Sequence, residues 1–370
     1  MKKVIYLFIS LISLIECLNW KLEPTCEIPP ARGGHRLVNV DDELIVLWGG
    51  FFECFEPVTQ NCDNQYRDDL WHYDLDKDKW ISVNVTTDKP EPRTFFGANL
   101  WKRDESIVVV FAGARYNSTF TSYVNFGDIW YYNPYQKTWT LINATNDGPG
   151  PRTGPSVAIY KDDMYVFGGV AGTSTSALQI KGDLWKFNLI TKNWTLLIPE
   201  GQPGNPQPTY LGSFRLDKER KQMVLYSGAI IRAGAGILTN ETWLYSIRHN
   251  DWRKVGNVIP SRVHNSAEVI DDQFVVAFGD MQVTVNGTDQ CITSTISSGH
   301  KPTKEVWALN LNSLRWKQLD VKCSEKKKRT ASTRVRGRIF DWGGFNYECP
   351  FGAPGYPLWD RQLRSLKIED

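Results

Sequence analysis

Short apolar runs that end at glycine recur six times along the chain. They cover residues 44–50, 108–113, 164–169, 223–228, 274–279 and 339–344. In the unit at residues 150–198, three further segments alternate apolar and polar positions, and turns rich in Asp and Gly separate them. Alternation with period two, with many β-branched and aromatic residues, predicts four short antiparallel strands in each unit. Successive units begin roughly 45 to 65 residues apart, a spacing typical of four-stranded blades rather than helix pairs.

A pair of tryptophans follows each of the first five apolar runs, and its two members are nine positions apart. The pairs are Trp71/Trp80, Trp130/Trp139, Trp185/Trp194, Trp243/Trp252 and Trp307/Trp316. A buried indole contributes about 150 to 250 Å² of contact. We therefore expect the tryptophans to pack within and between neighbouring blades.

The order of these features resembles the kelch repeat: Gly-Gly, then Asp-Leu-Trp-x-Tyr/Phe-Asp/Asn, then Trp. Segments 69–80, 128–139 and 183–194 carry the pattern most fully. Units four and five depart from it mildly, since Glu241 and Glu305 stand near the aspartate position. Ser227 and Phe278 also replace the first glycine in these two units. The resemblance implies an all-β fold, a six-bladed kelch β-propeller formed by residues 18–370 as a single domain.

The sixth unit shows a third strand without a fourth. Residues 363–370 align with the third strand of unit five, and no second tryptophan follows them. Residues 18–22 resemble residues 193–197, the fourth strand of unit three. We therefore expect an N-terminal strand to complete the last blade and close the ring, which removes exposed sheet edges. The alternative interpretation is a stray aromatic residue near a processing site.

Residues 1–17 are expected to form a signal peptide. Lys2 and Lys3 precede an apolar core at residues 4–15, which is too short to span a bilayer comfortably. Cleavage is expected near Cys17, although Glu16 makes the cleavage site imperfect. No later segment is apolar enough for a membrane span. The predicted location is extracellular or the lumen of the secretory pathway.

Six Asn-x-Thr sequons follow the predicted signal peptide, each in or beside a predicted turn or strand end. They lie at Asn84, Asn117, Asn143, Asn193, Asn240 and Asn286. Single sequons occur by chance, but six of them behind a signal peptide favour a glycosylated protein.

An even number of cysteines is left once Cys17 leaves with the signal peptide, which suits disulfides in an oxidising compartment. These are Cys26, Cys54, Cys62, Cys291, Cys323 and Cys349. Cys54 and Cys62 share one loop and are expected to pair. The other four allow three connectivities, of which Cys26–Cys349 with Cys291–Cys323 is favoured because each pair would join elements of one blade. A zinc site is disfavoured because no Cys-x-x-Cys occurs and the histidines are scattered, so no metal or cofactor is expected.

The loops that enter the first strand of each unit carry arginines. They are Arg32, Arg93, Arg152, Arg262 and Arg329, with Tyr210 at the corresponding place in unit four. Two interpretations stay open. The guanidinium groups could bind a carboxylate, sulfate or phosphate. The favoured alternative is that they pair with the acids before the first tryptophans, and so lock blade to blade, because acid and base recur together. Those acids are Asp69, Asp128, Asp183, Glu241 and Glu305.

Aromatic residues gather in the long loops of the first and last units, which ring closure would make neighbours. We call this set the aromatic seam: Phe51, Phe52, Phe55, Phe345, Tyr347, Phe351 and Tyr356. Long loops on a rigid ring commonly carry recognition, so the seam is the candidate contact surface for a protein partner. The alternative is loop self-packing around the disulfides. The basic run at residues 326–329 could also attract an anionic glycan.

A formal net charge of +2 over 370 residues argues against general nucleic-acid binding. Enzymes related to kelch proteins need specific residues, and most of these are missing. The iron-binding series Glu, Asp, His has only Asn64, Asp68 and His72 as its nearest counterpart. Copper-oxidase and sialidase residue sets are also missing. A sugar mutarotase would need channel-facing polar groups such as Arg152, His264 and Glu268. The sequence thus favours a secreted binding or scaffold module, with a carbohydrate-active enzyme as the alternative.

Overall fold

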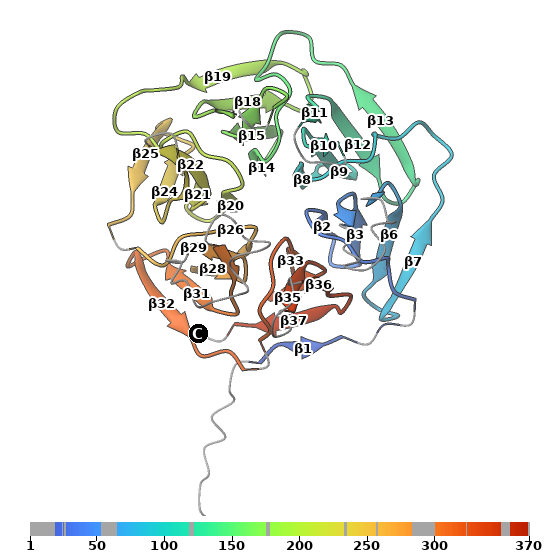
Figure 1. Ribbon diagram of the computed structural model, residues 1–370. Helices are drawn as coiled ribbons and strands as arrows, with labels where there is room; N and C mark the ends of the chain where they lie inside the picture. The colour runs from blue at the N-terminus through green and yellow to red at the C-terminus, as the bar shows by residue number, and fades with distance from the viewer. Residues whose placement is uncertain are drawn as a thin grey trace, which may run out of the picture.

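All regular secondary structure in the described residues is β-strand. The computed structural model describes residues 19–23, 25, 27–52, 65–117, 122–174, 178–232, 235–256, 258–282, 300–322, 324–348 and 356–368. Within these ranges, six four-stranded antiparallel sheets are present. They stand as blades in a ring around a central axis (Figure 1). The predicted all-β propeller fold is therefore confirmed.

Each blade is a meander that runs outward from the axis, and the first three blades follow one another in sequence. Blade 1 contains β2 (Arg36–Val40), β3 (Leu44–Trp48), β6 (Leu70–Asp74) and β7 (Lys79–Val83). Blade 2 contains β8 (Gly97–Lys102), β9 (Ser106–Phe111), β12 (Ile129–Asn133) and β13 (Thr138–Ile142). Blade 3 contains β14 (Ser156–Tyr160), β15 (Asp163–Phe167), β18 (Leu184–Asn188) and β19 (Trp194–Ile198).

The other three blades repeat this arrangement, and the last one takes its outer strand from the N-terminal part of the chain. Blade 4 contains β20 (Ser213–Asp217), β21 (Gln222–Tyr226), β24 (Thr242–Ser246) and β25 (Asp251–Lys254). Blade 5 contains β27 (Ser266–Ile270), β28 (Gln273–Ala277), β31 (Val306–Asn310) and β32 (Arg315–Leu319). Blade 6 contains β33 (Ala331–Val335), β34 (Arg338–Trp342), β37 (Arg364–Lys367) and β1 (Lys21–Leu22).

β1 joins the two ends of the chain. It pairs antiparallel with β37, with Lys21 opposite Ser365 and Leu22 opposite Arg364. The backbone N–H of Glu23 also donates to the carbonyl of Leu363 at 2.9 Å. The strand expected at residues 18–22 is thus present at its second half, in the blade where the sequence placed it.

The loops between the second and third strands extend into hairpins on one face of the ring, which we call the loop face. The paired segments are β4 (Phe51–Phe52) with β5 (Gln65–Tyr66), β10 (Ala114–Tyr116) with β11 (Tyr123–Asn125), β16 (Val170–Ala171) with β17 (Gln179–Ile180), β22 (Ala229–Arg232) with β23 (Ala235–Leu238), β29 (Asp280–Gln282) with β30 (His300–Pro302), and β35 (Phe345–Glu348) with β36 (Tyr356–Trp359). In blade 5, β26 (Arg262–Val263) adds a third strand to its hairpin. The expected loops therefore carry regular structure, which holds them against the blades.

Six apolar clusters fill the wedges between adjacent blades, and each contains one tryptophan from an outer strand. That tryptophan contacts an aromatic ring of the preceding blade, with ring centroids between 5.1 and 5.9 Å apart. The pairs are Trp80–Trp342, Trp139–Trp48, Trp194–Phe111, Trp252–Phe167, Trp316–Tyr226 and Trp20–Phe278. The second tryptophan of each repeat therefore packs between blades, as the sequence predicted, and Trp20 does the same for blade 6.

Blade 5 shows why one repeat departs from Gly-Gly. Five blades present a large aromatic residue directly before the glycine pair or its counterpart, but blade 5 has Ala277 there. Phe278 takes the place of the first glycine, adopts φ 62°, and supplies the ring that Trp20 contacts. The aromatic partner is thus moved by one residue instead of being lost.

Candidate functional site

The loops that enter the blades align in space residue by residue. In blades 1, 2, 3 and 5 the first aligned position is an arginine: Arg32, Arg93, Arg152 and Arg262. The backbone pairings of the next residue place Thr209 at this position in blade 4 and Lys327 in blade 6. The sequence alignment was therefore wrong by one residue at Tyr210 and by two residues at Arg329. Without the backbone hydrogen bonds, the basic run at residues 326–329 offered several equivalent registers.

The arginines at this position are buried and paired with the acids that the sequence suggested. Arg93 is fully buried, and its Nη2 donates to Asp128 Oδ2 at 2.9 Å. Burial would raise the pKa of the Asp128 carboxyl, but the hydrogen bond and charge of Arg93 hold this pKa below its ordinary value. Arg32 with Asp69, Arg152 with Asp183, and Arg262 with Glu305 form corresponding pairs. These guanidinium groups are therefore occupied by protein carboxylates.

The ion pair lies within a blade, and the backbone of the same arginine joins the blades. The carbonyl of Arg93 accepts from the N–H of Gly50 in blade 1 at 2.8 Å, while its side chain binds Asp128 in blade 2. The expectation that the ion pairs themselves lock blade to blade is therefore wrong. The first tryptophan of each repeat completes the unit, because Trp130 Nε1 donates to Asp128 Oδ2 at 2.7 Å.

Blade 6 replaces this unit with a lysine-centred one. Lys327 is buried and ion-pairs with Asp341, and with Asp360 at 3.1 Å. Arg329 lies two positions further along, where its guanidinium carbon is 5.0 Å from the centre of the Phe51 ring and 5.4 Å from that of Phe345. Arg329 is therefore an aromatic-packed residue of the loop face rather than a member of the arginine series.

Residues in left-handed conformation form a circle at the inner end of the entry loops. They are Gly34, Phe95, Gly154, Leu211, His264 and Arg329, and their φ angles lie between 53° and 67°. The N–H of each of five members donates to the carbonyl of its counterpart in the preceding blade, at 2.8 to 3.0 Å. A side chain in this conformation costs on the order of 1 kcal/mol or more. The circle offsets that cost with backbone bonds between blades.

The side chains of this circle narrow the axial channel at the loop face. The rings of Phe95 from blade 2 and His264 from blade 5, which face each other across the ring, stack with centroids 5.3 Å apart. His264 Nδ1 lies 3.1 Å from Asp280 Oδ2, and burial lowers the pKa of His264 to about 4 despite that carboxylate. His264 is therefore neutral at neutral pH.

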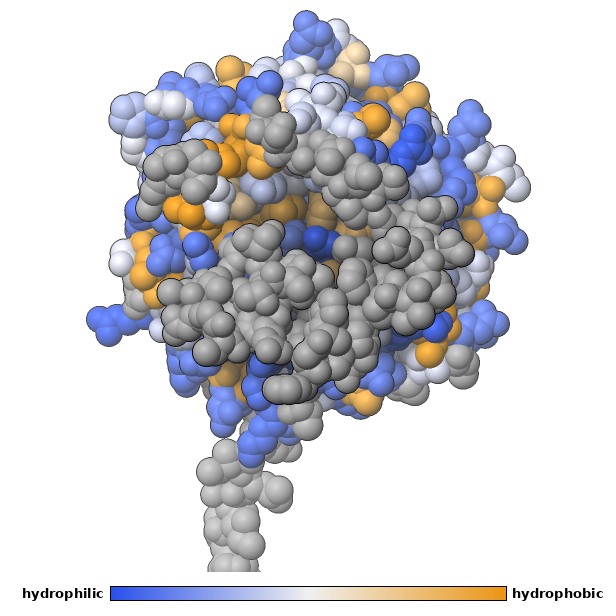
Figure 2. All heavy atoms as spheres, viewed as in Figure 1, coloured by the Kyte–Doolittle hydropathy of each residue, from blue (hydrophilic) through white to orange (hydrophobic). Residues whose placement is uncertain are grey.

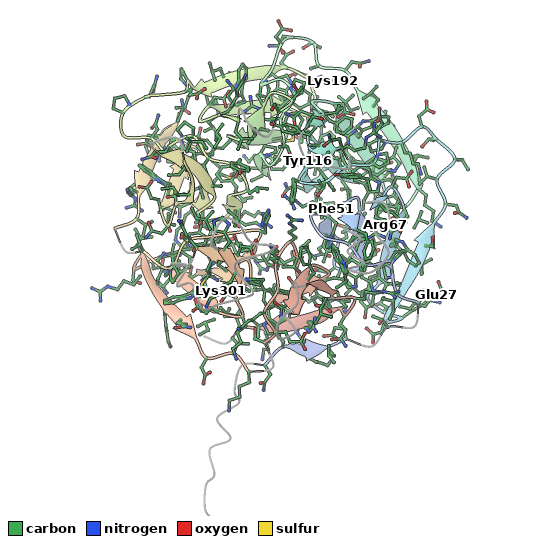
Figure 3. All side chains as sticks on the ribbon, viewed as in Figure 1. Glu27, Phe51, Arg67, Tyr116, Lys192 and Lys301 are labelled. Atoms are coloured by element: carbon green, nitrogen blue, oxygen red, sulfur yellow. The ribbon has the colours of Figure 1, made fainter. Side chains whose placement is uncertain are left out.

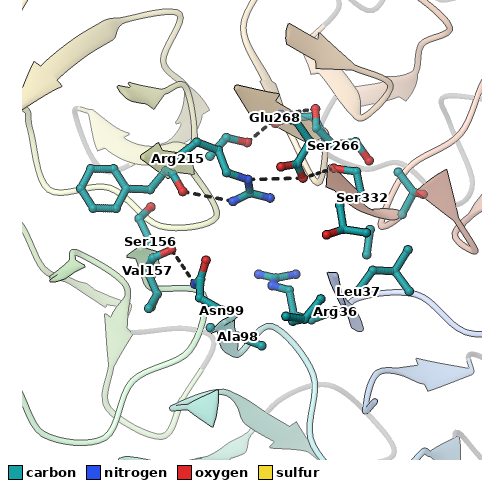
Figure 4. Close-up of a pocket in the computed structure, with 18 of the residues that line it drawn as sticks. Arg36, Leu37, Ala98, Asn99, Ser156, Val157, Arg215, Ser266, Glu268 and Ser332 are labelled. Atoms are coloured by element: carbon teal, nitrogen blue, oxygen red, sulfur yellow. Dashed lines mark hydrogen bonds and ion pairs between the residues drawn. The ribbon is translucent and has the colours of Figure 1, made fainter. Parts of the chain in front are cut away.

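Beneath this constriction the first strands of all six blades enclose a cavity of about 280 Å³. Arg36, Arg215, Arg329 and Arg334 line it, and among the described lining residues Glu268 supplies the one carboxylate. Figure 4 shows the side chains of Arg36 and Arg215 extending into this space from opposite sides. His264 and Glu268, which the sequence suggested for a channel enzyme, do line the cavity, but Arg152 does not.

On the loop face, the aromatic seam joins the first and last blades. The rings of Phe52 and Trp359 lie 5.0 Å apart, and Trp359 also contacts Phe345 at 4.6 Å. Phe51 and Phe345 are buried, whereas Phe52 and Trp359 keep intermediate exposure. Phe51 lies toward the inside of the ring in Figure 3, and Glu27 at its periphery. Trp359 is a seam residue that the sequence analysis missed, although a tryptophan just before the last strand was a usable signal.

Several expected residues have only a backbone position or lie outside the described ranges. Tyr347 and Tyr356 belong to the paired strands β35 and β36. Phe55, Phe351, Asn286 and the cysteines Cys26, Cys54, Cys62, Cys291, Cys323 and Cys349 lie outside the described residues. The other five sequon asparagines, Asn84, Asn117, Asn143, Asn193 and Asn240, are all exposed.

The described residues hold neither a cluster of metal-ligating side chains nor a membrane-spanning helix. No three His, Cys, Asp or Glu side chains lie close enough together there to hold a metal ion. His72, considered in an iron-binding series, is instead buried, with Nε2 2.9 Å from the Tyr132 hydroxyl in the next blade. In the same part of the chain, no helix is long and apolar enough to cross a membrane.

Known proteins share this architecture. The bovine and human proteins named Kelch domain-containing protein 10 are each 24% identical over 309 residues, which is 80% of this chain and 62% of theirs. A fruit-fly Leucine-zipper-like transcriptional regulator 1 homolog is 23% identical over 281 residues, 27% of its length. The solved structure of YjhT superposes with a TM-score of 0.63, covering 93% of this chain and 97% of that one at 15% identity, and it shows likeness of fold alone.

The chain matches less than two thirds of the length of the bovine and human relatives, so their remaining segments have no counterpart in the match. The family model for the KLHDC2/KLHL20/DRC7 Kelch-repeats domain matches residues 10–228, more than half of the chain. This match agrees with the repeated glycine, acid and tryptophan positions and with the ring of four-stranded blades. The chain therefore belongs to the Kelch-repeat family.

Proposed function

We propose that this protein is a binding module of the secretory route, which recognises a protein or glycan partner through the loop face at blades 6 and 1. The observation that carries the proposal is the partly exposed contact of Phe52 with Trp359, which joins the hairpins of the first and last blades. Leu358 beside it is 47% exposed. Exposed apolar side chains next to rigidly held aromatic rings are typical of the centre of an interface.

The predicted glycans in the described residues leave blade 6 open, and in blade 1 Asn84 follows the outer strand β7 at the periphery of the ring. Asn84 and Asn143 follow outer strands, Asn117 follows β10, and Asn240 precedes β24, so all four belong to the first four blades. No described sequon lies in blade 6. The signal peptide, the sequons and the cysteine count together support passage through an oxidising compartment. Kelch propellers bind proteins in general, and a rigid ring with structured loops suits that role.

Expression in a eukaryotic cell tests the compartment. We expect the protein in the medium, lacking residues near 1–17, with glycans that an endoglycosidase removes and with Cys54 joined to Cys62. Intact mass, N-terminal sequencing and non-reducing peptide mapping measure these properties. Retention in the cytosol, or unmodified sequons in secreted material, contradicts the secretory part of the proposal.

A matched pair of variants tests the contact surface. Phe52→Ser combined with Leu358→Ser should reduce capture of protein partners or array glycans by about tenfold or more, because a few central apolar groups usually dominate interface energy. Leu196→Ser changes a similarly exposed apolar residue on the outer strand β19 and should leave capture unchanged. Capture is quantified by mass spectrometry and by glycan array, with thermal unfolding as the check on folding. Equal losses in both variants would exclude the loop face as the site.

A carbohydrate-active enzyme remains the second candidate, and the cavity is the observation that favours it. His264 with its Asp280 partner and Glu268 reach the same space. Anomer exchange or glycoside turnover that is abolished by Glu268→Gln, but kept by the Phe52/Leu358 variant, would favour the enzyme over the binding module.

A further inference from the structure

Arg36 is a cation of the axial cavity for which the described residues supply no acidic partner. Arg36 begins β2, and its Nη1 donates to the carbonyl of His35 at 3.0 Å. Its guanidinium carbon also lies 5.9 Å from the centre of the Phe96 ring. Within the described ranges, no carboxylate lies at ion-pairing distance from it, in contrast to Arg32, Arg93, Arg152 and Arg262. A desolvated guanidinium ordinarily has a carboxylate or phosphate partner.

The surroundings of Arg36 leave room for such a partner. The positions that match Arg36 in the other five first strands are small: Gly97, Ser156, Ser213, Ser266 and Ala331. All five line the cavity, and none of them brings a large side chain into it. In Figure 2 strongly hydrophilic atoms are visible in the hollow at the centre of the ring.

Arg215 supplies a second cation from the opposite blade (Figure 4). Its Nε donates to the carbonyl of Ala267 at 2.7 Å and lies 3.5 Å from Glu268 Oε1. Its Nη1 donates to the carbonyl of Phe214 at 3.1 Å. Ser332 Oγ donates to Glu268 at 2.8 Å, which fixes the carboxylate beside the arginine. Among the described groups none accepts from Nη2 of Arg215, so this donor stays available to the cavity.

The positive charges of Arg36 and Arg215 repel each other across the cavity. Burial, and then the charge of Arg215, lower the pKa of Arg36 to about 10. Guanidinium groups keep their positive charge in proteins, so the repulsion between Arg36 and Arg215 in a poorly solvated space is retained in the empty protein. An anion between them removes this repulsion and restores a partner to Arg36.

We propose that the axial cavity is a binding site for a small oxyanion, a molecule with one carboxylate or phosphate group that Arg36 and Arg215 hold from opposite sides. Two guanidinium groups offer several donors in fixed directions, which suits the planar or tetrahedral oxygens of such a group. A volume of about 280 Å³ admits a small molecule but no polymer. This site is separate from the loop face, because Phe95 and His264 stack between them, so it extends beyond the proposed function and does not depend on it.

The test uses the full-length protein, with acetate, glucuronate, phosphate and sulfate as probes at constant ionic strength. The wild-type protein should gain thermal stability with at least one probe, and calorimetry should show saturable binding. Arg36→Gln should weaken binding by about tenfold to a hundredfold, the range for loss of a charge-assisted hydrogen bond. Arg103→Gln, which changes an exposed arginine paired loosely with Asp104, is the matched control and should bind as the wild type does.

A second readout distinguishes a ligand site from a structural role. In chloride buffer without a probe, Arg36→Gln should unfold at the same temperature as the wild type or higher, because it removes an uncompensated charge. Binding of the carboxylate probes but not of phosphate would identify the ligand group as a carboxylate. Binding of phosphate but not of the carboxylates would identify it as a phosphate. Either result supports the proposal.

Three results would overturn it: no probe saturates the wild type, Arg36→Gln binds the probe equally well, or Arg36→Gln lowers the unfolding temperature in probe-free buffer. If Arg36→Gln fails to fold, Arg36→Lys and Arg215→Gln replace it in the binding assay. If both of these variants bind the probe as strongly as the wild type does, the proposal is also overturned.

Discussion

Replacing Trp20 by alanine should lower the free energy of unfolding by about 3 to 5 kcal/mol, a large share of the stability of most single domains. Trp20 is 4% exposed and stacks on Phe278 with centroids 5.1 Å apart. It is the outer-strand residue that joins blade 5 to blade 6. Its loss leaves a void at the one place where the ring has no covalent continuity within a blade. Chemical denaturation followed by tryptophan fluorescence and circular dichroism measures the change.

Leu22 provides the control for this prediction. It lies in β1, two positions after Trp20, but it is 55% exposed, so Leu22→Ser should change stability by less than about 0.5 kcal/mol. Deletion of residues 18–22 should have a larger effect than Trp20→Ala, because it also leaves the edge of β37 unpaired. An unchanged unfolding midpoint after the deletion would show that blade 6 does not need β1.

Asp128→Asn should cost about 2 to 3 kcal/mol, the second largest effect that we expect from a single substitution. The substitution leaves the fully buried Arg93 without a carboxylate, and removal of one partner from a buried ion pair is strongly destabilising. The estimate is below the range for fully buried pairs because the Asp128 side chain keeps 30% exposure. Urea denaturation of the purified variant measures the loss.

The matched control for this substitution is Asp76→Asn. Asp76 pairs with Arg336 at 3.2 Å, but both side chains are more than half exposed. Such pairs contribute about 0 to 1 kcal/mol. Equal effects of the two substitutions would mean that the repeated arginine and acid do not stabilise the blades through burial.

The repeated features of the fold could be predicted from the sequence because each blade packs the same kinds of residue at the same positions. The glycine runs, the tryptophan pairs and the register of Trp20 all follow from local patterns, and the pairing of β1 with β37 lies in the predicted blade. The partners of the arginines could also be named, since Asp69, Asp128 and Asp183 stand at a constant distance from the first tryptophan.

What sequence could not supply is contact between residues that belong to opposite blades. Arg36 and Arg215 stand far apart in the chain and carry no repeat signal, so only the closed ring shows that they share a cavity. The stacking of Phe95 on His264 is hidden for the same reason. The alignment of Lys327 was missed because its blade uses a lysine where the others use arginine, and backbone hydrogen bonds were needed to fix the register.

The pairing of β1 with β37 also sets an order of events during synthesis. Ser365 donates a side-chain hydrogen bond to Glu23, 342 positions earlier in the chain. At about 5 to 20 residues per second, translation of that stretch takes roughly 17 to 70 s. Blades 1 to 5 can form in turn during this interval, while the first strand made has no sheet to join. The final folding step therefore waits until β37 has been made, and a protease that trims the N-terminal segment beforehand would remove the strand that completes blade 6.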